Sequence, residues 1–361
     1  SAASDVYKRQ DLGYFPSSWK VSSITMILKP DKVASLPSSY RPISLLPALG
    51  KLLEKIMTLK ITTYMVKENL LNEFQAGFRK GKSCVHQLLR LSEHVSLWFN
   101  KRSGGRTVGL FIDAEKAFDS VWHAGLKKLL YDSKLPIKII RWISSFLDNR
   151  QGRVRVNSFT SITVQLQAGV PQGSILAPLL YITFIKDMPT INSHEIITSF
   201  FADDTSYAAS EDNRKNRKVF PANHLQNIIN NLESYCSKWR ISLNPSKTWC
   251  LNFFHKTINN NTPRLWLRGE LVKYKKELKF LGITFDHGLT FEAHIKVVRA
   301  KCLKRLNLLK ALCGKNWGLL QRQFCTPTEA ISVLSSNTAP FSLHTLTGHY
   351  SKKFNQLRQP L

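Results

Sequence analysis

Apolar positions along the chain follow two periods, which predict a fold of mixed helices and strands. They recur at helical spacing in residues 49–65, and residues 15–100 as a whole have a mostly helical texture. Residues 108–114, VGLFIDA, are apolar on both faces, a pattern typical of a central strand that is covered on both sides. A helix is expected soon after this strand, with Asp119 or Ser120 as its cap.

The second half of the chain predicts a hairpin between two further helices. Residues 168–185 form a Gly- and Pro-bearing loop that leads into an apolar helix, with Ser174 as its cap. Residues 195–209 indicate a β-hairpin with two acids at its bend, and a helix and a strand follow it. This order matches the split β-α-β-β-α-β arrangement. Residues 278–286 predict one more strand or hairpin, and residues 291–313 predict a basic helix.

The charge of the chain points to a polyanionic partner. The 361 residues include 52 Lys and Arg against 24 Asp and Glu, which gives a formal net charge of +28. Basic residues run along the whole sequence, whereas basic membrane binding usually shows a concentrated amphipathic helix or a polybasic tail. Nucleic acid is therefore favoured over a membrane surface as the partner.

Cysteine spacing and hydropathy exclude several other classes of protein. The six cysteines form no C-x-x-C pair and no Cys/His cluster at zinc spacing, so neither a disulfide framework nor a structural zinc is indicated. The longest uncharged run, residues 156–185, is interrupted by Asn, Gln and Pro, which is wrong for a membrane span. The thiols are expected to be reduced, which is typical of an intracellular protein.

Two adjacent acids, Asp203 and Asp204, lie in the otherwise apolar or neutral stretch FFADDTSYAA. Like charges held together resist burial unless a positive charge lies between them. The nearest basic residues are Lys186 and Arg214, so two alternatives remain: an exposed turn, or a site for metal cations. Asp113 ends the predicted central strand, where open sheets place their chemistry. Three carboxylates on adjacent strands suit two hard divalent cations, which at a separation of about 4 Å catalyse in-line phosphoryl transfer.

Seven motifs follow one another between about residues 15 and 320. They are SYRPISLLPALGKLLEKI, FQAGFRKGKS, LFIDAEKAFDSVWH, GVPQGSILAPLLY, FFADDTSY, LNPSKT and KFLGITF. In this order they resemble the reverse transcriptases of non-LTR retrotransposons of the long interspersed type. The resemblance implies RNA-templated DNA synthesis, primed from a nick in target DNA.

The resemblance also implies an α+β right-hand polymerase fold. The fingers are expected at 15–107, the palm at 108–289 with 140–185 partly in the fingers, and a helical thumb at 290–320. Residues 1–14 are expected to be an uncertain, non-native stretch, and residues 321–361, where the family pattern is lost, stay unassigned. Members of the family often carry an endonuclease upstream of this domain, so the chain is expected to be a fragment.

The resemblance assigns the acids to a metal site. Asp113 and Asp203 would bind two Mg²⁺ ions, for which Mn²⁺ is a possible substitute. Asp204 would complete the acidic cluster, and the backbone carbonyl of Ile112 would add a ligand. Lys247, in LNPSK, matches the position proposed to protonate the departing pyrophosphate, and the alternative for this lysine is a structural countercharge.

Six residues are expected at the nucleotide, and three of them also have a structural alternative. The resemblance places there Lys29, Arg41, Ala114, Phe118, Gln172 and Gly173. Arg41 suits a triphosphate through its bidentate fork. Lys29 could instead be an ordinary surface lysine, and Gly173 could serve only a tight turn. Phe118 would exclude a ribose 2′-oxygen or else be an ordinary core residue.

The remaining expected contacts are to the primer and to the template. Phe280, Leu281 and Gly282 match the strand that grips the primer end, although FLG is equally readable as core β-strand. Nucleic-acid contacts are expected from Arg79, Lys80, Lys301, Lys304 and Arg305.

The leading hypothesis is an RNA-directed DNA polymerase that binds an RNA template, a DNA primer or target DNA, and dNTPs. A viral-type RNA replicase shares the palm but must admit a 2′-hydroxyl, which the bulky ring of Phe118 disfavours. A catalytically inactive relic that only binds nucleic acid is the other alternative, because the family pattern is lost after Gln321. Such a protein is expected inside the cell, in cytoplasm and nucleus.

Overall fold

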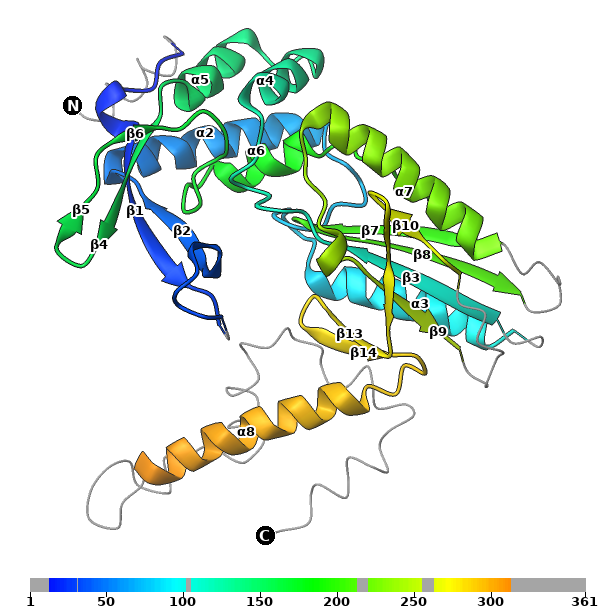
Figure 1. Cartoon of the computed structure of the whole chain (residues 1–361). Helices are drawn as coiled ribbons and strands as arrows, with labels where there is room; N and C mark the ends of the chain where they lie inside the picture. Colours follow the sequence, from blue (N-terminus) through cyan, green and yellow to red (C-terminus); the bar gives the residue numbers. More distant parts are fainter. Residues whose placement is uncertain (1–12, 31, 102–104, 213–219, 255–262, 313–361) are drawn as a thin grey trace.

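The computed structural model describes residues 13–30, 32–101, 105–212, 220–254 and 263–312. This part of the chain contains two five-stranded sheets (Figure 1). The central sheet has the strand order β12-β9-β3-β8-β7, and its strands are Gly105–Ile112 (β3), Ile196–Phe201 (β7), Asp204–Asp212 (β8), Trp249–Phe253 (β9) and Lys273–Lys275 (β12). The outer sheet has the order β2-β1-β4-β5, with β6 also paired to β4, and its strands are Val21–Leu28 (β1), Tyr40–Leu45 (β2), Gln151–Val156 (β4), Phe159–Thr160 (β5) and Val164–Gln165 (β6).

Strand β3 lies in the middle of the central sheet and is buried over its whole length. It pairs antiparallel with β8 on one side and with β9 on the other. Its side chains alternate between two hydrophobic clusters, with Val108 and Leu110 in one and Phe111 in the other. The predicted central strand, covered on both faces, is thereby confirmed.

Two long helices cover the faces of the central sheet. Helix α7 (Phe220–Trp239) lies on one face and helix α3 (Cys84–Phe99) on the other (Figure 1). Their inward side chains are fully buried and comprise Leu225, Ile228, Ile229 and Leu232 from α7, and Leu88, Leu91 and Val95 from α3. Each such side chain contributes about 1.5–3 kcal/mol on burial, so the two helices fix the sheet firmly from both sides.

The outer sheet was not expected, because residues 15–100 were predicted to be mostly helical. Helix α2 (Ala48–Lys67) covers the predicted 49–65, but strands β1 and β2 precede it. Most residues of these two strands are half-buried or exposed rather than alternately buried and open. A strand whose residues do not alternate between buried and exposed shows no period of two in the sequence. The prediction for residues 15–100 was therefore based on the helical pattern of the following segment.

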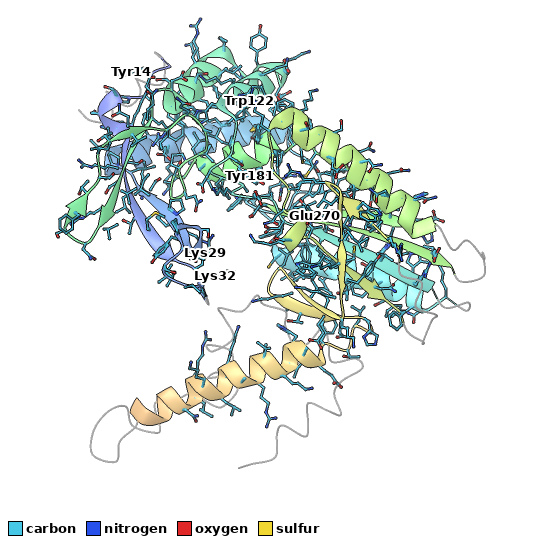
Figure 2. All side chains as sticks on the ribbon, viewed as in Figure 1. Tyr14, Lys29, Lys32, Trp122, Tyr181 and Glu270 are labelled. Carbon is cyan, nitrogen blue, oxygen red and sulfur yellow. The ribbon has the colours of Figure 1, made fainter. Side chains whose placement is uncertain are left out.

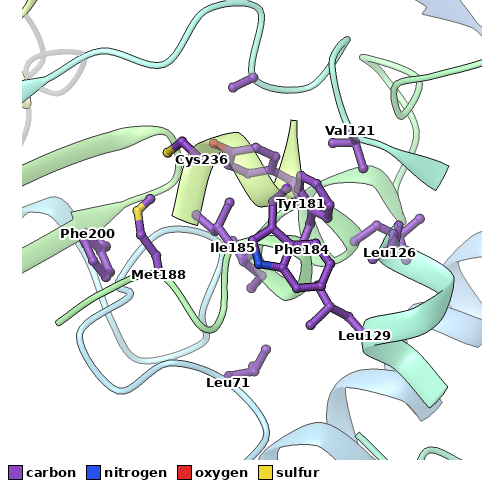
Figure 3. Close-up of a cluster of buried hydrophobic side chains, with 14 of the residues drawn as sticks. Leu71, Val121, Leu126, Leu129, Tyr181, Phe184, Ile185, Met188, Phe200 and Cys236 are labelled. Carbon is purple, nitrogen blue, oxygen red and sulfur yellow. The ribbon is translucent and has the colours of Figure 1, made fainter. Parts of the chain in front are cut away.

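The shorter helices are α4 (His123–Asp132), α5 (Ile137–Leu147) and α6 (Ala177–Phe184). In Figure 1, α6 lies between the two sheets, next to α2, and α4 and α5 lie above α2 in this view. Almost every side chain of α6 is buried, as expected for a helix that is apolar all round. Figure 3 shows its residues Tyr181 and Phe184 among Leu126 and Leu129 of α4.

The expected cap of α4 is wrong. The helix begins at His123, with Trp122 before it and no side-chain cap. The amides of Asp119 and Ser120 both donate to the carbonyl of Lys116, which closes a separate turn ahead of the helix. The carboxylate of Asp119 instead accepts a hydrogen bond from Gln172, so a tertiary contact replaces the predicted local one.

A hairpin and a long helix end the described part of the chain. The hairpin joins Glu277–Phe280 (β13) to Ile283–Asp286 (β14), and a smaller ribbon, Trp266–Leu267 (β10) with Glu270–Leu271 (β11), precedes it. Helix α8 (Glu292–Leu312) follows, close to the predicted 291–313. None of the described helices is long and apolar enough to cross a membrane. Residues 313–320 of the expected thumb and the tail 321–361 lie outside the described residues.

His94 on α3 should make stability depend on pH. Burial lowers the pKa of His94 to about 4, with the nearby His194 and Arg90 acting in the same direction, and its Nε2 lies 2.8 Å from Ser210 Oγ. Since the folded pKa lies below the unfolded value of 6.5, this contribution is complete above about pH 6.5 and is lost as the pH falls towards 4. The loss amounts to about 3 kcal/mol. Chemical denaturation of the wild type and of His94→Gln between pH 7.5 and 4 measures it, and parallel pH curves for the two proteins would contradict the assignment.

Candidate active site

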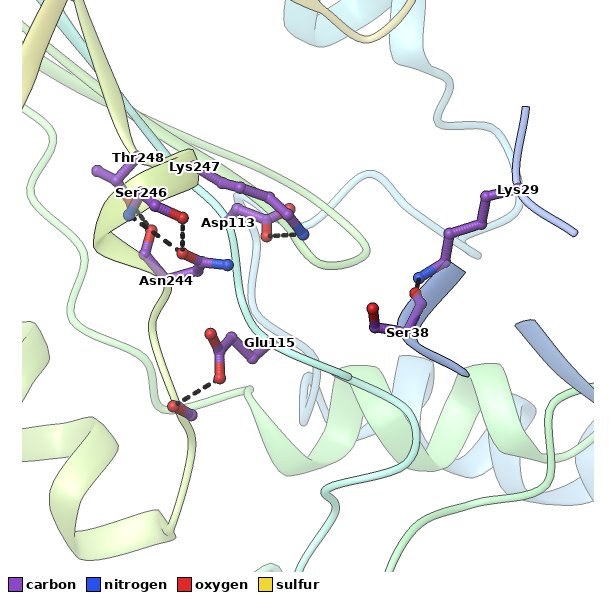
Figure 4. Close-up of polar contacts among 9 residues, drawn as sticks. Lys29, Ser38, Asp113, Glu115, Asn244, Ser246, Lys247 and Thr248 are labelled. Carbon is purple, nitrogen blue, oxygen red and sulfur yellow. Dashed lines mark hydrogen bonds and ion pairs between the residues drawn. The ribbon is translucent and has the colours of Figure 1, made fainter. Parts of the chain in front are cut away.

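Asp113 follows directly after β3, at the end of the central strand. The carbonyl of Asp113 accepts a hydrogen bond from the amide of Asn244 at 3.0 Å, and Ala114 forms a β-bridge with Leu243. The side chain of Asp113 forms an ion pair with Lys247, whose Nζ lies 3.1 Å from Asp113 Oδ2 (Figure 4). The backbone is therefore held on one side by the segment that also supplies the countercharge.

Asp203 and Asp204 lie at the turn between β7 and β8, as predicted. Phe201 pairs with Asp204, so Ala202 and Asp203 are the two turn residues, and Ala202 has a φ of 57°. In the ladder between β3 and β8 the last pair is Ile112 with Thr205. One further step of this register sets Asp113 opposite Asp204, which brings the three predicted carboxylates to one edge of the sheet.

The charges of these acids act on one another. The pKa of Asp204 is raised to about 6, first by desolvation and then by the negative charges of Asp203 and Asp113. The pKa of Asp203 is also raised, mainly by desolvation, while Arg41 and Lys247 act in the opposite direction. Asp204 keeps an exposed surface, so its desolvation comes from protein atoms crowded around the carboxylate and not from enclosure. The positive charges of Arg41 and Lys247 therefore only partly offset the negative charge of the three acids.

The donors at this edge have the chemistry that a hard divalent cation requires. Carboxylate oxygens of Asp113, Asp203 and Asp204 carry excess negative charge, and such oxygens are preferred ligands of Mg²⁺. Within the described ranges, however, no three His, Cys, Asp or Glu side chains form a preformed metal-binding group. The ammonium of Lys247 lies beside the carboxylate of Asp113, one of the three acids.

Lys247 is presented by a tightly bonded turn. It ends a short 3₁₀ turn, Pro245–Lys247 (η4). The side-chain oxygen of Asn244 accepts hydrogen bonds from the amide and the hydroxyl of Ser246, and Thr248 Oγ1 donates to the carbonyl of Asn244 (Figure 4). The motif LNPSK therefore fixes the backbone, while its lysine side chain stays 60% exposed.

Gln172 and Gly173 lie in a loop that is held from both sides. The amide of Ser44 on β2 donates to the carbonyl of Gln172 at 2.7 Å, and a Cβ on Gly173, whose φ is 111°, would meet the carbonyl of Ser44 at 2.7 Å. On the other side, Val170 donates to the carbonyl of Phe118. Gly173 thus serves a close approach to the outer sheet, which no side chain would allow.

The structure adds Glu54 to the residues that shape this loop. Its side chain on α2 is fully buried, and Oε2 accepts hydrogen bonds from the hydroxyl of Ser174 and the amide of Ile175. Ser174 Oγ in turn accepts from the amides of Leu176 and Ala177. The residue before α6 is Leu176, which has no side-chain cap, so the predicted cap position is wrong, although the Ser174 hydroxyl still satisfies two amides at the start of the helix. An acid on the apolar face of residues 49–65 was the signal in the sequence that could have found Glu54.

Phe118 lies at an aromatic junction. Its ring stacks on Tyr181 with 4.8 Å between centroids and meets Phe78 edge-on at 6.1 Å. The ring is half-buried, so one part packs on the core and another part stays accessible. Both alternatives for Phe118, a gate and a packing residue, remain compatible with this position.

The basic residues predicted in the fingers segment, residues 15–107, have different surroundings. Lys29 Nζ donates to the carbonyl of Ser38 (Figure 4), and Figure 2 shows Lys29 and Lys32 at the tip of the β1–β2 ribbon. Arg41 is exposed on β2, and its charge acts on Asp203. Arg79 Nη1 donates to the carbonyl of Asn72 and is half-buried, whereas Lys80 is exposed. Arg41 therefore has the strongest electrostatic link to the acids within this group.

The residues expected at the primer divide between core and turn. Phe280 is buried and packs edge-on against Phe111 beneath β3, with centroids 5.0 Å apart. Leu281 and Gly282 form the turn of the β13–β14 hairpin, both at positive φ, as a type I′ turn requires. Only these two turn residues are placed where a ligand could approach them.

Helix α8 keeps its predicted basic character. Lys301 and Lys304 are exposed and Arg305 is half-buried. After Glu292 no carboxylate follows up to Thr328. After Glu292 at its first position, the described helix therefore carries basic residues and no further acid, which suits a phosphate backbone.

Known proteins resemble this chain over most of its length. The family described as reverse transcriptase (RNA-dependent DNA polymerase) matches residues 27–285. A protein of Drosophila melanogaster described as a probable RNA-directed DNA polymerase from transposon BS is 36% identical over 312 residues, 84% of this chain and 33% of that protein. The RNA-directed DNA polymerase from mobile element jockey of the same species is 35% identical over 295 residues, 79% and 31% respectively. The chain thus spans about a third of the length of these curated relatives.

A solved structure supports the fold. Telomerase of Candida tropicalis, in complex with a fragment of telomeric RNA, matches with a TM-score of 0.51 at 13% identity, over 97% of this chain and 58% of that one. At this identity the match shows the fold alone, and that fold is the right-hand polymerase fold predicted from the motifs. Members of the matched family generally use divalent metal ions.

Removing one carboxylate should stabilise the metal-free protein. Asp204→Asn eliminates a charge that Asp203 and Asp113 repel, so the Tm without divalent metal should rise by at most a few degrees. Scanning calorimetry in EDTA measures the shift. Asp132→Asn is the matched control, because Asp132 is an aspartate on α4 whose partner, Lys128, attracts it at 3.0 Å. A lower Tm for Asp204→Asn than for this control would contradict the mutual repulsion.

Proposed function

The chain belongs to the reverse transcriptase family, and we propose that it copies the RNA of a mobile element into DNA as an RNA-directed DNA polymerase. The observation that carries the proposal is the meeting of Asp113, Asp203 and Asp204 at one edge of the central sheet, with Lys247 and Arg41 acting on them. Its substrates are an RNA template, a DNA primer or target DNA, and dNTPs.

The acids are proposed to hold two Mg²⁺ ions, or Mn²⁺ in their place. Asp113 and Asp203 would hold the ions, Asp204 would complete the negative charge, and the carbonyl of Ile112 would add an oxygen. Bound in this way, two such ions activate a primer hydroxyl and stabilise the oxygen that leaves in the phosphoryl transfer. The raised pKa values of Asp203 and Asp204 support this role, because they indicate negative charge that Arg41 and Lys247 do not fully offset.

The other site residues bind and orient the nucleotide. Arg41 and Lys29 bind the triphosphate, and Ala114 and the 172–173 loop line the nucleotide. Lys247 keeps an ammonium beside Asp113, from which it can donate a proton to the departing pyrophosphate. The hydrogen bonds of the loop to Ser44 and Phe118 support its role, because they hold it rigidly between the two sheets.

The duplex is proposed to follow the parts of a polymerase hand. Fingers occupy 15–107, palm 108–289 and thumb 290–320, with the 140–185 segment shared because β4 pairs with β1 of the outer sheet. Arg79, Lys80 and the basic residues Lys301, Lys304 and Arg305 contact phosphates, and Leu281 and Gly282 contact the primer. We place this activity inside the cell, in cytoplasm and nucleus, where element RNA and target DNA are found.

Asp203→Asn should abolish primer extension, because it removes one of the charges that hold the metal ions. The assay measures incorporation of dTTP on poly(rA)/oligo(dT) with Mg²⁺ or Mn²⁺. Asp132→Asn, with the same chemical change on α4, should retain the wild-type rate. Full activity of Asp203→Asn would contradict the metal site, and a folded wild type that never extends a primer would favour the inactive relic.

Phe118→Val should relax the choice of sugar. If the ring excludes the 2′-hydroxyl, the ratio of kcat/KM for UTP to that for dTTP rises tenfold or more, each factor of ten being worth about 1.4 kcal/mol. Removing a ring that only packs on Tyr181 should instead cost up to ~3–5 kcal/mol of stability and lower both activities together. Steady-state kinetics with both nucleotides separates the outcomes, and an unchanged ratio excludes the gate.

A further inference from the structure

The side chain of Gln75 forms hydrogen bonds to the turn that carries Asp203. Gln75 lies between α2 and α3 and is 2% exposed. Its Oε1 accepts hydrogen bonds from the amide of Ala202 at 2.8 Å and from the amide of Gly77 at 2.7 Å. Its Nε2 donates to the carbonyl of Ala202 at 3.3 Å. Both backbone polar groups of one turn residue are therefore satisfied by a single amide from a distant part of the chain.

The backbone around Gln75 lies against the same hairpin. The amide of Ala76 donates to the carbonyl of Phe200, the amide of Phe200 donates to the carbonyl of Phe74, and Gln75 forms a parallel β-bridge with Phe200. A Cβ on Gly77 would meet the nitrogen of Ala202 at 2.2 Å. The segment 74–77 thus acts as a short extra strand beside the end of β7, at a distance that only glycine permits.

This turn needs support from outside. Ala202 has a φ of 57°, a backbone conformation that costs an L-residue about 1–2 kcal/mol. In hairpin turns, glycine normally occupies a position of positive φ. The next two residues, Asp203 and Asp204, carry charges that repel each other. A strained turn with two like charges persists only where its surroundings hold it.

We infer that Gln75 is a positioning residue, which holds the Ala202–Asp203 turn in the geometry that the acids need to bind metal. Its effect on catalysis rests on the proposed polymerase function, whereas its effect on the turn does not. Gln75 is buried and its three hydrogen bonds are all made to backbone groups of the protein, so its proposed role is positioning and not catalysis.

Gln87 provides a matched control for this inference. It is also a buried glutamine, 5% exposed, and its Nε2 donates to the carbonyl of Phe74 at 2.9 Å. Among the described residues, its hydrogen bond therefore goes to the same segment and not to the turn. Gln75→Leu and Gln87→Leu remove the same amide group, so a general loss of packing should appear in both variants and a loss of turn geometry only in the first.

The first measurement is residue-resolved hydrogen exchange without metal. In the wild type the amides of Ala202 and Gly77 should be protected, and Gln75→Leu should speed their exchange at least tenfold, while Gln87→Leu leaves them slow. Gln75→Glu, which keeps an oxygen acceptor for both amides, should restore most of the protection. Rapid exchange of the Ala202 amide in the wild type, which requires no variant to fold, would overturn the inference, as would equal effects of the two leucine variants.

The second measurement connects the turn to the metal. Adding Mn²⁺ should raise the Tm of the wild type and of Gln87→Leu, and this rise should be lost or halved in Gln75→Leu. In primer extension Gln75→Leu should lower kcat at least tenfold with little change in KM for the primer–template. A wild type without polymerase activity would contradict the proposed function only, since exchange and Mn²⁺ stabilisation still decide the role of Gln75. An undiminished Mn²⁺ shift in Gln75→Leu would refute that role.

Discussion

Repulsion among Asp113, Asp203 and Asp204 is the constraint on which the rest of this structure depends. The fold brings these negative charges together at the end of β3 and at the turn of β7 and β8, where desolvation raises the pKa of Asp203 and Asp204. Ionic contacts alone do not offset this, because Lys247 reaches Asp113 only at the exposed end of a flexible side chain. Packing of the sheet offsets the free-energy cost of this repulsion, because both faces of β3 are buried and its pairing with β8 and β9 fixes the register.

Backbone hydrogen bonds from segments far apart in the chain hold these acids in place. The 74–77 segment supports the acidic turn, and the 242–244 segment pairs with the chain just after β3. The loop at 169–174 is tied to the outer sheet through Ser44 and to α2 through the buried carboxylate of Glu54. In each case a buried polar group is satisfied by a group from another element, which makes these contacts specific and costly to lose.

Local patterns predicted much of the fold, because they report a residue's immediate surroundings. The double burial of β3 was readable in the apolar run of VGLFIDA, and the β7–β8 hairpin was readable from the acids that interrupt an apolar stretch. Helix α8 followed from its spacing and its lack of acids. The outer sheet was missed because half-exposed strands give no clear period, and the cap of α4 was wrong because Asp119 is recruited by Gln172.

The sequence by itself indicated the candidate residues for the chemistry: three acids in ordered motifs, a lysine in LNPSK, and a strongly basic chain suited to nucleic acid. The motifs also indicated the family before any geometry was known. Only the tertiary structure decided how these residues are held. Gln75 and Glu54 act on backbone groups more than a hundred residues away, and no local period records such a pairing. The reason is physical: a side-chain hydrogen bond depends on where two elements meet, and that meeting is set by the packing of the whole core.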